Sequence, residues 1–135
     1  MAMTMQAIMK FCPQQRRKLS TEVKIVATKL RKKNGYPMFL AKTRSLTDAK
    51  GRPVPAGRAN VYLTSVEIYE KRQVIVSCSC DDWTFFWEFA CNKKGAARIE
   101  YSNGEPPKEK NVNLVPGCCK HLYKVGTYMI EKGMI

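Results

Sequence analysis

The residues of this 135-residue chain that could do chemistry are six cysteines and one histidine, and five of these seven lie in two short motifs. A single serine separates Cys78 from Cys80, while Cys118 and Cys119 precede His121, the only histidine. Three thiolates and one imidazole make up a tetrahedral zinc site with four protein ligands, which leaves no position for an activated water. The sequence therefore predicts a structural zinc site and no catalytic one.

The spacing within each motif indicates which side chains can reach the same metal ion. Residues i and i+2 of a strand share a face, so Cys78 and Cys80 can both face one ion. In a regular helix Cys119 and His121 would diverge by about 200°. They converge only across the irregular start of a helix, which the preceding Pro-Gly at 116–117 could supply. Cys118 and His121, at i and i+3, fit a helix face at least as well, so spacing leaves the third ligand open.

The pairs C-S-C at 78–80 and C-K-H at 119–121 resemble the SWIM zinc finger, whose pattern is C-x-C, a variable spacer and C-x-H. The resemblance spans roughly residues 58–132 and implies Cys78, Cys80, Cys119 and His121 as ligands, with Cys118 outside the set. The spacer, 81–118, is 38 residues and long for that family. With this insertion the chain resembles small SWIM-type proteins of tailed bacteriophages. SWIM domains are taken as DNA-binding or protein-interaction modules.

The remaining cysteines and the acidic pair at 81–82 have simpler interpretations. Disulfides are disfavoured because no export signal is present and adjacent cysteines pair poorly. We expect Cys12 and Cys91 to be small buried apolar residues, although Cys91 could serve as a spare ligand. The acidic pair suits a helix cap better than acid–base catalysis, and no glycine-rich phosphate loop occurs. We therefore expect no enzyme and no small-molecule substrate.

The elements that must position the ligands predict an α+β fold. Alternating apolar residues bounded by turn residues predict strands at 38–46, 60–69 and 73–78, with a loop at 48–57, as an antiparallel meander that ends at the first cysteine pair. Helices are predicted from 81 to a stop at Gly95 and over 119–132, where Leu122, Val125 and Met129 face inward. The prediction is a β-meander followed by two helices around the zinc.

The first of these helices carries more apolar surface than one face can bury. Its aromatic side chains lie on opposite sides, so either the rest of the domain or another protein must cover the second side. The long irregular connection 102–117 is also typical of a segment that functions in binding. The predicted partner-binding residues are Trp83, Phe85, Phe86, Trp87 and Phe89.

The N-terminal quarter is strongly basic. Residues 1–35 hold nine Lys and Arg and one acid, so they contribute +8 of a formal net charge of +13. We predict a basic extension over 1–35 and a zinc-binding domain over 36–135. Segment 20–33 favours a helix stopped by Asn34-Gly35, although alternation at 23–27 keeps a strand possible. Such charge attracts polyanions. The predicted phosphate contacts are Arg16, Arg17, Lys18, Lys29, Arg31, Lys32 and Lys33.

Two functions are compatible with these features. The first is a non-enzymatic, zinc-stabilised component of an assembly, a bacteriophage head, neck or tail, that docks on other proteins. The alternative is a nucleic-acid-binding protein that contacts DNA phosphates through its basic N-terminal segment. No apolar run reaches the ~20 residues of a membrane span and the N-terminus lacks a secretory pattern. We expect synthesis in the host cytoplasm, with the virion as a possible destination.

Overall fold

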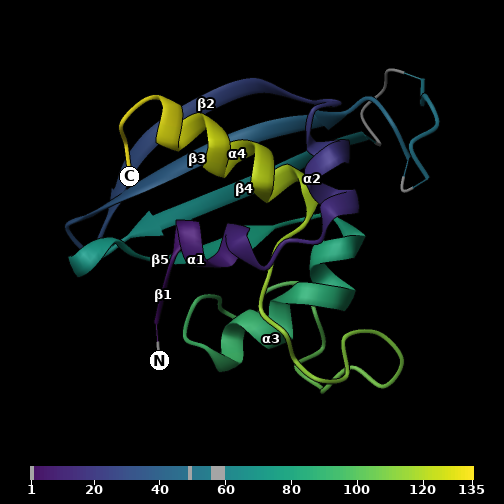
Figure 1. Ribbon diagram of the computed structural model, residues 1–135. Helices are drawn as coiled ribbons and strands as arrows, with labels where there is room; N and C mark the ends of the chain where they lie inside the picture. The colour runs from purple at the N-terminus through teal and green to yellow at the C-terminus, as the bar shows by residue number, and fades with distance from the viewer. Residues whose placement is uncertain (1, 49, 56–59) are drawn as a thin grey trace.

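A five-stranded antiparallel sheet organises the part of the protein that the structure describes (Figure 1). The computed structural model describes residues 2–48, 50–55 and 60–135. The strands run in the order β1-β5-β4-β3-β2. Their bounds are β1 Met3–Thr4, β2 Val23–Lys33, β3 Tyr36–Ser45, β4 Val61–Ile68 and β5 Gln73–Cys78. The predicted antiparallel meander is confirmed as β3, β4 and β5.

Four α-helices accompany the sheet within the described ranges, and the α+β class is confirmed. They are α1 Met5–Lys10, α2 Gln14–Ser20, α3 Glu88–Lys93 and α4 Lys120–Glu131. A π-helical turn, Trp83–Trp87, leads into α3, and a 3-10 turn, Glu70–Arg72, joins β4 to β5. The helix predicted over 119–132 is confirmed as α4. None of the helices in the described ranges has the length and apolarity needed to cross a bilayer.

Segment 20–33 is not a helix: the helix prediction is wrong and the strand alternative is confirmed. Val23–Lys33 pairs along its length with β3. Asn34 and Gly35 both adopt positive φ, 52° and 85°, which is the conformation of a two-residue hairpin turn rather than of a helix stop. Residues 1–35, predicted as an extension, thus supply two strands of the common sheet as well as α1 and α2.

The core lies between one face of the sheet and α1, α2 and α4, which Figure 1 shows on the same side. Leu122, Val125 and Met129 of α4 are completely buried, as predicted. Gly126, in the middle of α4, has a packing role: a Cβ there would lie 2.5 Å from the sulfur of Met9. The glycine therefore lets α1 approach α4 closely enough to close the core.

Candidate metal centre

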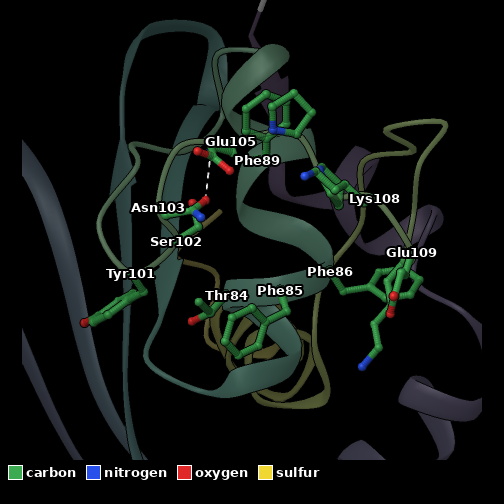
Figure 2. A pocket seen from close by; sticks show the side chains of 13 residues that line it. Thr84, Phe85, Phe86, Phe89, Tyr101, Ser102, Asn103, Glu105, Lys108 and Glu109 are labelled. Atoms are coloured by element: carbon green, nitrogen blue, oxygen red, sulfur yellow. Dashed lines mark hydrogen bonds between the residues drawn. The ribbon is translucent and has the colours of Figure 1, made fainter.

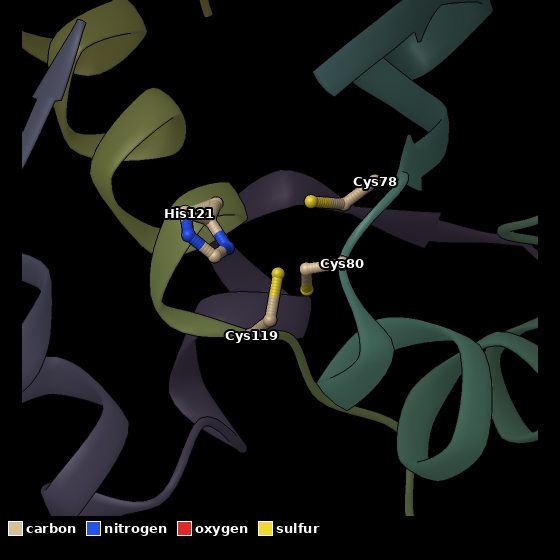
Figure 3. Close-up of side chains that lie close together, drawn as sticks. All are labelled: Cys78, Cys80, Cys119 and His121. Atoms are coloured by element: carbon tan, nitrogen blue, oxygen red, sulfur yellow. The ribbon is translucent and has the colours of Figure 1, made fainter. Parts of the chain in front are cut away.

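Four side chains from two distant parts of the chain converge between the sheet and α4 (Figure 3). Cys78, Cys80, Cys119 and His121 each offer one ligand atom, and these atoms all lie within 4.8 Å of one another. All four residues are buried. The set includes Cys119 and not Cys118, which resolves the choice that spacing left open. The arrangement can hold a metal ion.

The first pair of ligands sits where β5 gives way to a helix. Cys78 is the last residue of β5, and Ser79 continues the pairing with β4, because its amide donates to Leu63 O at 3.0 Å and its Oγ accepts from Leu63 N at 2.9 Å. The chain then turns at Cys80. The amide of Trp83 donates to Cys80 Sγ at 3.4 Å, so this sulfur takes the place of a helix N-cap oxygen. The sulfur of Cys80 thus starts the helical segment 83–93, which we call the aromatic helix.

The second pair straddles the start of α4. Cys119 is the N-cap, with extended dihedrals of φ −76° and ψ 170°, and His121 is the second helical residue. This break from helical geometry removes the divergence of about 200° that a regular helix would impose. Gly117 prepares the break, since a Cβ there would lie 2.6 Å from the Trp87 ring. Close packing of the chain against that indole brings Cys119 to the site.

The imidazole of His121 is already oriented for ligation. Its Nε2 is hydrogen-bonded to Ser45 Oγ at the end of β3, and the ring of Tyr62 packs at 4.6 Å between centroids. Its Nδ1 is buried and has no hydrogen-bond partner within the described ranges. An Nε2–H that donates to Ser45 leaves the lone pair on Nδ1, which is the form a metal ligand requires. The residues present therefore fit a metal ion, with Nδ1 as the ligand atom.

The three cysteine thiols of the candidate metal centre differ in pKa. Burial raises the pKa of Cys78 and of Cys119 well above the ordinary thiol value. Hydrogen bonds from the Cys119 and Cys78 thiols lower the pKa of Cys80. Without a cation, one thiolate is stabilised by two neighbouring thiols. A bound divalent ion would replace those two protons, because only thiolates ligate it.

We expect metal binding to depend steeply on pH, with the higher affinity at high pH. Since Cys78 and Cys119 are protonated near neutral pH, each must lose a proton when a metal binds. Release of about two protons would raise the apparent affinity roughly 100-fold per pH unit. Competition with a chromophoric chelator at several pH values would measure this slope. A flat profile would show that these two thiols do not ligate.

The other three cysteines pack beside the centre. The Cys12 thiol donates to Cys118 O, and the Cys91 thiol donates to Gly117 O, both at 3.2 Å. Burial raises the pKa of Cys91 to about 12. All three side chains lie in the core cluster, as expected for Cys12 and Cys91. They fix the segment that leads into α4.

Asp82, one of the two acids expected to cap a helix, precedes the π-helical turn but makes no side-chain cap hydrogen bond. Its carboxylate accepts from Arg16 Nη2 at 2.8 Å, from Arg16 Nε at 3.2 Å and from Trp87 Nε1 at 3.2 Å. The Arg16 guanidinium also lies over the Phe86 ring, 5.1 Å from its centroid. This two-bonded ion pair docks α2 on the aromatic helix. Arg16 therefore has a structural partner and is not free for a phosphate.

The other predicted phosphate contacts fall into two groups. Arg17 donates to the carbonyls of Met9, Lys10 and Cys12, so it caps the C-terminal end of α1. The side chain of Lys33 lies 3.9 Å from Glu67. The exposed residues of the set are Lys18, Lys29, Arg31 and Lys32.

The aromatic residues predicted to bind a partner also separate. Trp83 and Trp87 are 0% and 2% exposed, so the protein's own core covers them. Phe85 is 61% exposed, and Phe86 and Phe89 are half-buried. These three line a groove of about 660 Å³ together with Tyr101 and the loop 102–110 (Figure 2). The helical segment 83–93 is therefore covered on one side by the protein's own core and faces the groove on the other.

Glu88 is a functional part of this region that the sequence interpretation missed. Its carboxylate is completely buried and accepts from Trp83 Nε1 at 3.2 Å and from the amides of Glu100, Tyr101 and Ser102 at 2.9–3.0 Å. It thereby fixes the beginning of the groove-lining loop. A single acid among five aromatic residues was the signal in the sequence, since a carboxylate in an apolar helix needs donors.

A second cavity, of about 610 Å³, reaches the edge of the metal centre. Cys80, Cys119 and His121 line it, with Arg16 and Lys120 at its walls. A metal ion therefore has a route to the ligands from this side.

Comparison of the chain with protein-family models, with curated proteins and with solved structures finds no match.

Proposed function

We propose that this protein is a non-enzymatic structural protein whose fold is clamped by zinc and which docks on other proteins of an assembly. The single observation that carries the proposal is the convergence of four buried ligand atoms, within 4.8 Å of one another, from the end of β5 and the start of α4. Four protein ligands close a tetrahedral sphere, so a bound zinc ion would hold these elements together and supply no reactive water.

Zinc is the metal that this donor set favours. Three thiolates with one imidazole suit a soft, tetrahedral ion better than magnesium or calcium, which take oxygen ligands. The C-x-C and C-x-H spacing, with Cys119 as the third ligand, is also that of the SWIM zinc finger. That similarity, and the resemblance of the long insertion to small phage proteins of this type, support a place in a bacteriophage head, neck or tail.

The docking surface we propose is the aromatic groove defined by Phe85, Phe86, Phe89 and Tyr101. Phe85 is 61% exposed although it belongs to a helical turn whose two tryptophans are buried. The loop that forms the far wall is held at its first residues by Glu88. A groove with aromatic side chains on one wall and polar and charged loop residues on the other fits a segment of a neighbouring protein that inserts an apolar side chain against the rings.

Photo-crosslinking in the cells that produce the protein would test this docking. A photoreactive phenylalanine analogue in place of Phe85 should give one discrete cross-linked product, and that product should sediment with a large particle. The same analogue in place of Ile130, which is 40% exposed on α4, serves as the matched control and should give none. Equal products from both positions, or a product only of monomer size, would refute docking through the groove.

A further inference from the structure

The two faces of the sheet differ sharply in what covers them. Alternate residues of β3, beginning with Phe39 and Ala41, are buried beneath the helices. The residues between them, Met38, Leu40, Lys42 and Arg44, must project from the opposite face, because successive strand residues alternate. Figure 1 shows α1, α2 and α4 only on the first side. We call the second side the open face. Its β4–β5 end is covered by segment 96–100, where Arg98 contacts Glu67 and Glu100 contacts Ser77, and the exposed part lies over β2, β3 and the first half of β4.

The register assigns further residues to the open face. Residues directly opposite one another in neighbouring strands share a face. Lys24 lies opposite Arg44, Lys29 opposite Leu40 and Arg31 opposite Met38. The same register places Lys32 opposite Pro37, and therefore on the other side of β2. The cations of the open face are Lys24, Lys29, Arg31, Lys33, Lys42 and Arg44.

The open face has little acid to balance these cations. Glu67 is the single acidic residue in β2, β3, β4 and β5. It is buried and already paired with Arg98 and Lys33. Within the part of the chain that the structure describes, the other five cations have no ion pair, and Arg44 Nε is buried without a hydrogen-bond partner. Two acids outside the strands border this face, Glu70 beside Tyr36 and Glu100 beside Ser77. The six strand cations outnumber these acids and Glu67, so the face keeps a net positive charge.

Protection of a sheet edge does not account for this charge. Lysines on an edge strand prevent edge-to-edge pairing, which would explain Lys24 and Lys29 on β2. Lys42 and Arg44 belong to β3, which is paired on both sides. Placing Lys24 directly opposite Arg44 also costs stability, because like charges on facing residues repel. A charge retained at such a cost on an interior strand points to a ligand.

We propose that the open face binds the phosphate backbone of a nucleic-acid duplex without reading its sequence. Residues i and i+2 of β2 place cations about 6.8 Å apart along a line, which suits a repeating polyanion. Apolar Met38, Leu40 and Leu63 lie between the cations, and the one aromatic ring on these strands near the face, Tyr36, is engaged with Tyr69 and Glu70. Along β2 and β3, where the cations lie, the surface thus offers charge rather than rings for stacking bases, which favours phosphates of a duplex over a single strand.

Fluorescence anisotropy with a labelled duplex of mixed sequence, over a series of salt concentrations, tests this proposal. Five phosphate contacts give a log–log salt slope of about −4.5 for duplex DNA. Replacing Lys24, Lys29 and Lys42 with glutamine should reduce the slope to about −1.8 and weaken binding by about 100-fold or more at ~0.1 M salt. Duplex RNA in place of DNA distinguishes the two sources of the same phosphate chemistry.

The matched control replaces Lys18, Lys32 and Lys132, which are equally exposed lysines away from the open face. This variant has the same net charge as the first and should bind within about threefold of the wild type. Circular dichroism and metal content should be the same for both variants. Four results would overturn the proposal. They are an equal loss of duplex affinity in both variants, a flat salt dependence of binding, tighter binding to a single strand than to the duplex, and tighter binding to anionic vesicles than to the duplex. None of these results depends on docking at the aromatic groove.

Discussion

Replacing Cys119 with serine should abolish metal binding and unfold much of the region around α4. The substitution removes one of four candidate ligands, whose ligand atoms lie within 4.8 Å of one another. Structural zinc contributes about 10–16 kcal/mol of binding free energy in small zinc modules, and that energy is coupled to folding. We expect a loss of about 5 kcal/mol or more, which is a fall in Tm of roughly 15 °C or more. Elemental analysis and thermal melting measure the two effects.

The neighbouring Cys118→Ser variant is the matched control. Cys118 is equally buried, but it lies outside the ligand cluster, where its carbonyl accepts from the Cys12 thiol. This variant should keep one metal per chain and lose only about 1–2 kcal/mol, as for a polar atom placed in a core. If Cys118→Ser lost the metal and Cys119→Ser retained it, the ligand assignment would be refuted, and with it the similarity to the SWIM pattern.

Replacing Glu88 with alanine should destabilise the protein almost as strongly, without removing the metal. The substitution leaves the Trp83 indole and three loop amides without their acceptor. Loss of a buried charged acceptor with several donors costs about 3–5 kcal/mol. Hydrogen exchange of the amides at 100–102 should accelerate by about 100-fold or more, since each 1.4 kcal/mol is a factor of about ten.

Two further variants separate the carboxylate's role from a general effect of charge. Glu88→Gln keeps one acceptor oxygen and should lie between the wild type and alanine in stability. Glu100→Gln changes an exposed acid of the same segment, whose only side-chain contact within the described ranges is a long 3.5 Å bond from Ser77 Oγ, and should be nearly neutral. Unchanged exchange at 100–102 in Glu88→Ala would show that the loop is held by other contacts.

The parts of the fold that the sequence predicted are those where local pattern and tertiary packing agree. The meander and α4 follow from alternation and from helical spacing of residues such as Leu122 and Met129, and both patterns coincide with burial. The ligand cluster was predicted from residue type, because few arrangements of thiols and imidazole remain in a chain with one histidine. Spacing alone left Cys118 and Cys119 open, and the resemblance to the SWIM pattern implied Cys119. The structure supplies the physical reason, which is the extended backbone of Cys119 as the N-cap of α4.

The failures have physical causes that no local pattern reveals. In β2 the basic residues reduce the apolar alternation, and Asn34-Gly35 serves equally well to end a helix or to turn a hairpin. The acidic pair at 81–82 was expected to cap a helix because the partner of Asp82, Arg16, lies 66 residues away in the chain and no local pattern reveals it. The burial of Trp83 and Trp87 depends on segments that return from α2 and from residue 117, so it follows from tertiary packing rather than from helical periodicity.

The two fixed ends of the groove-lining loop have a consequence for how this protein could be altered. Glu88 anchors residues 100–102, and Asn111 anchors the other end, because its Nδ2 donates to Phe86 O at 2.7 Å and to Val115 O at 2.9 Å. A loop held at both ends stays attached whatever residues lie between its two anchors. Doubling its length would cost only about 0.6 kcal/mol in closure entropy. Residues 103–110 could therefore be exchanged for foreign peptides, which would replace one wall of the aromatic groove and make the protein a scaffold for displaying them.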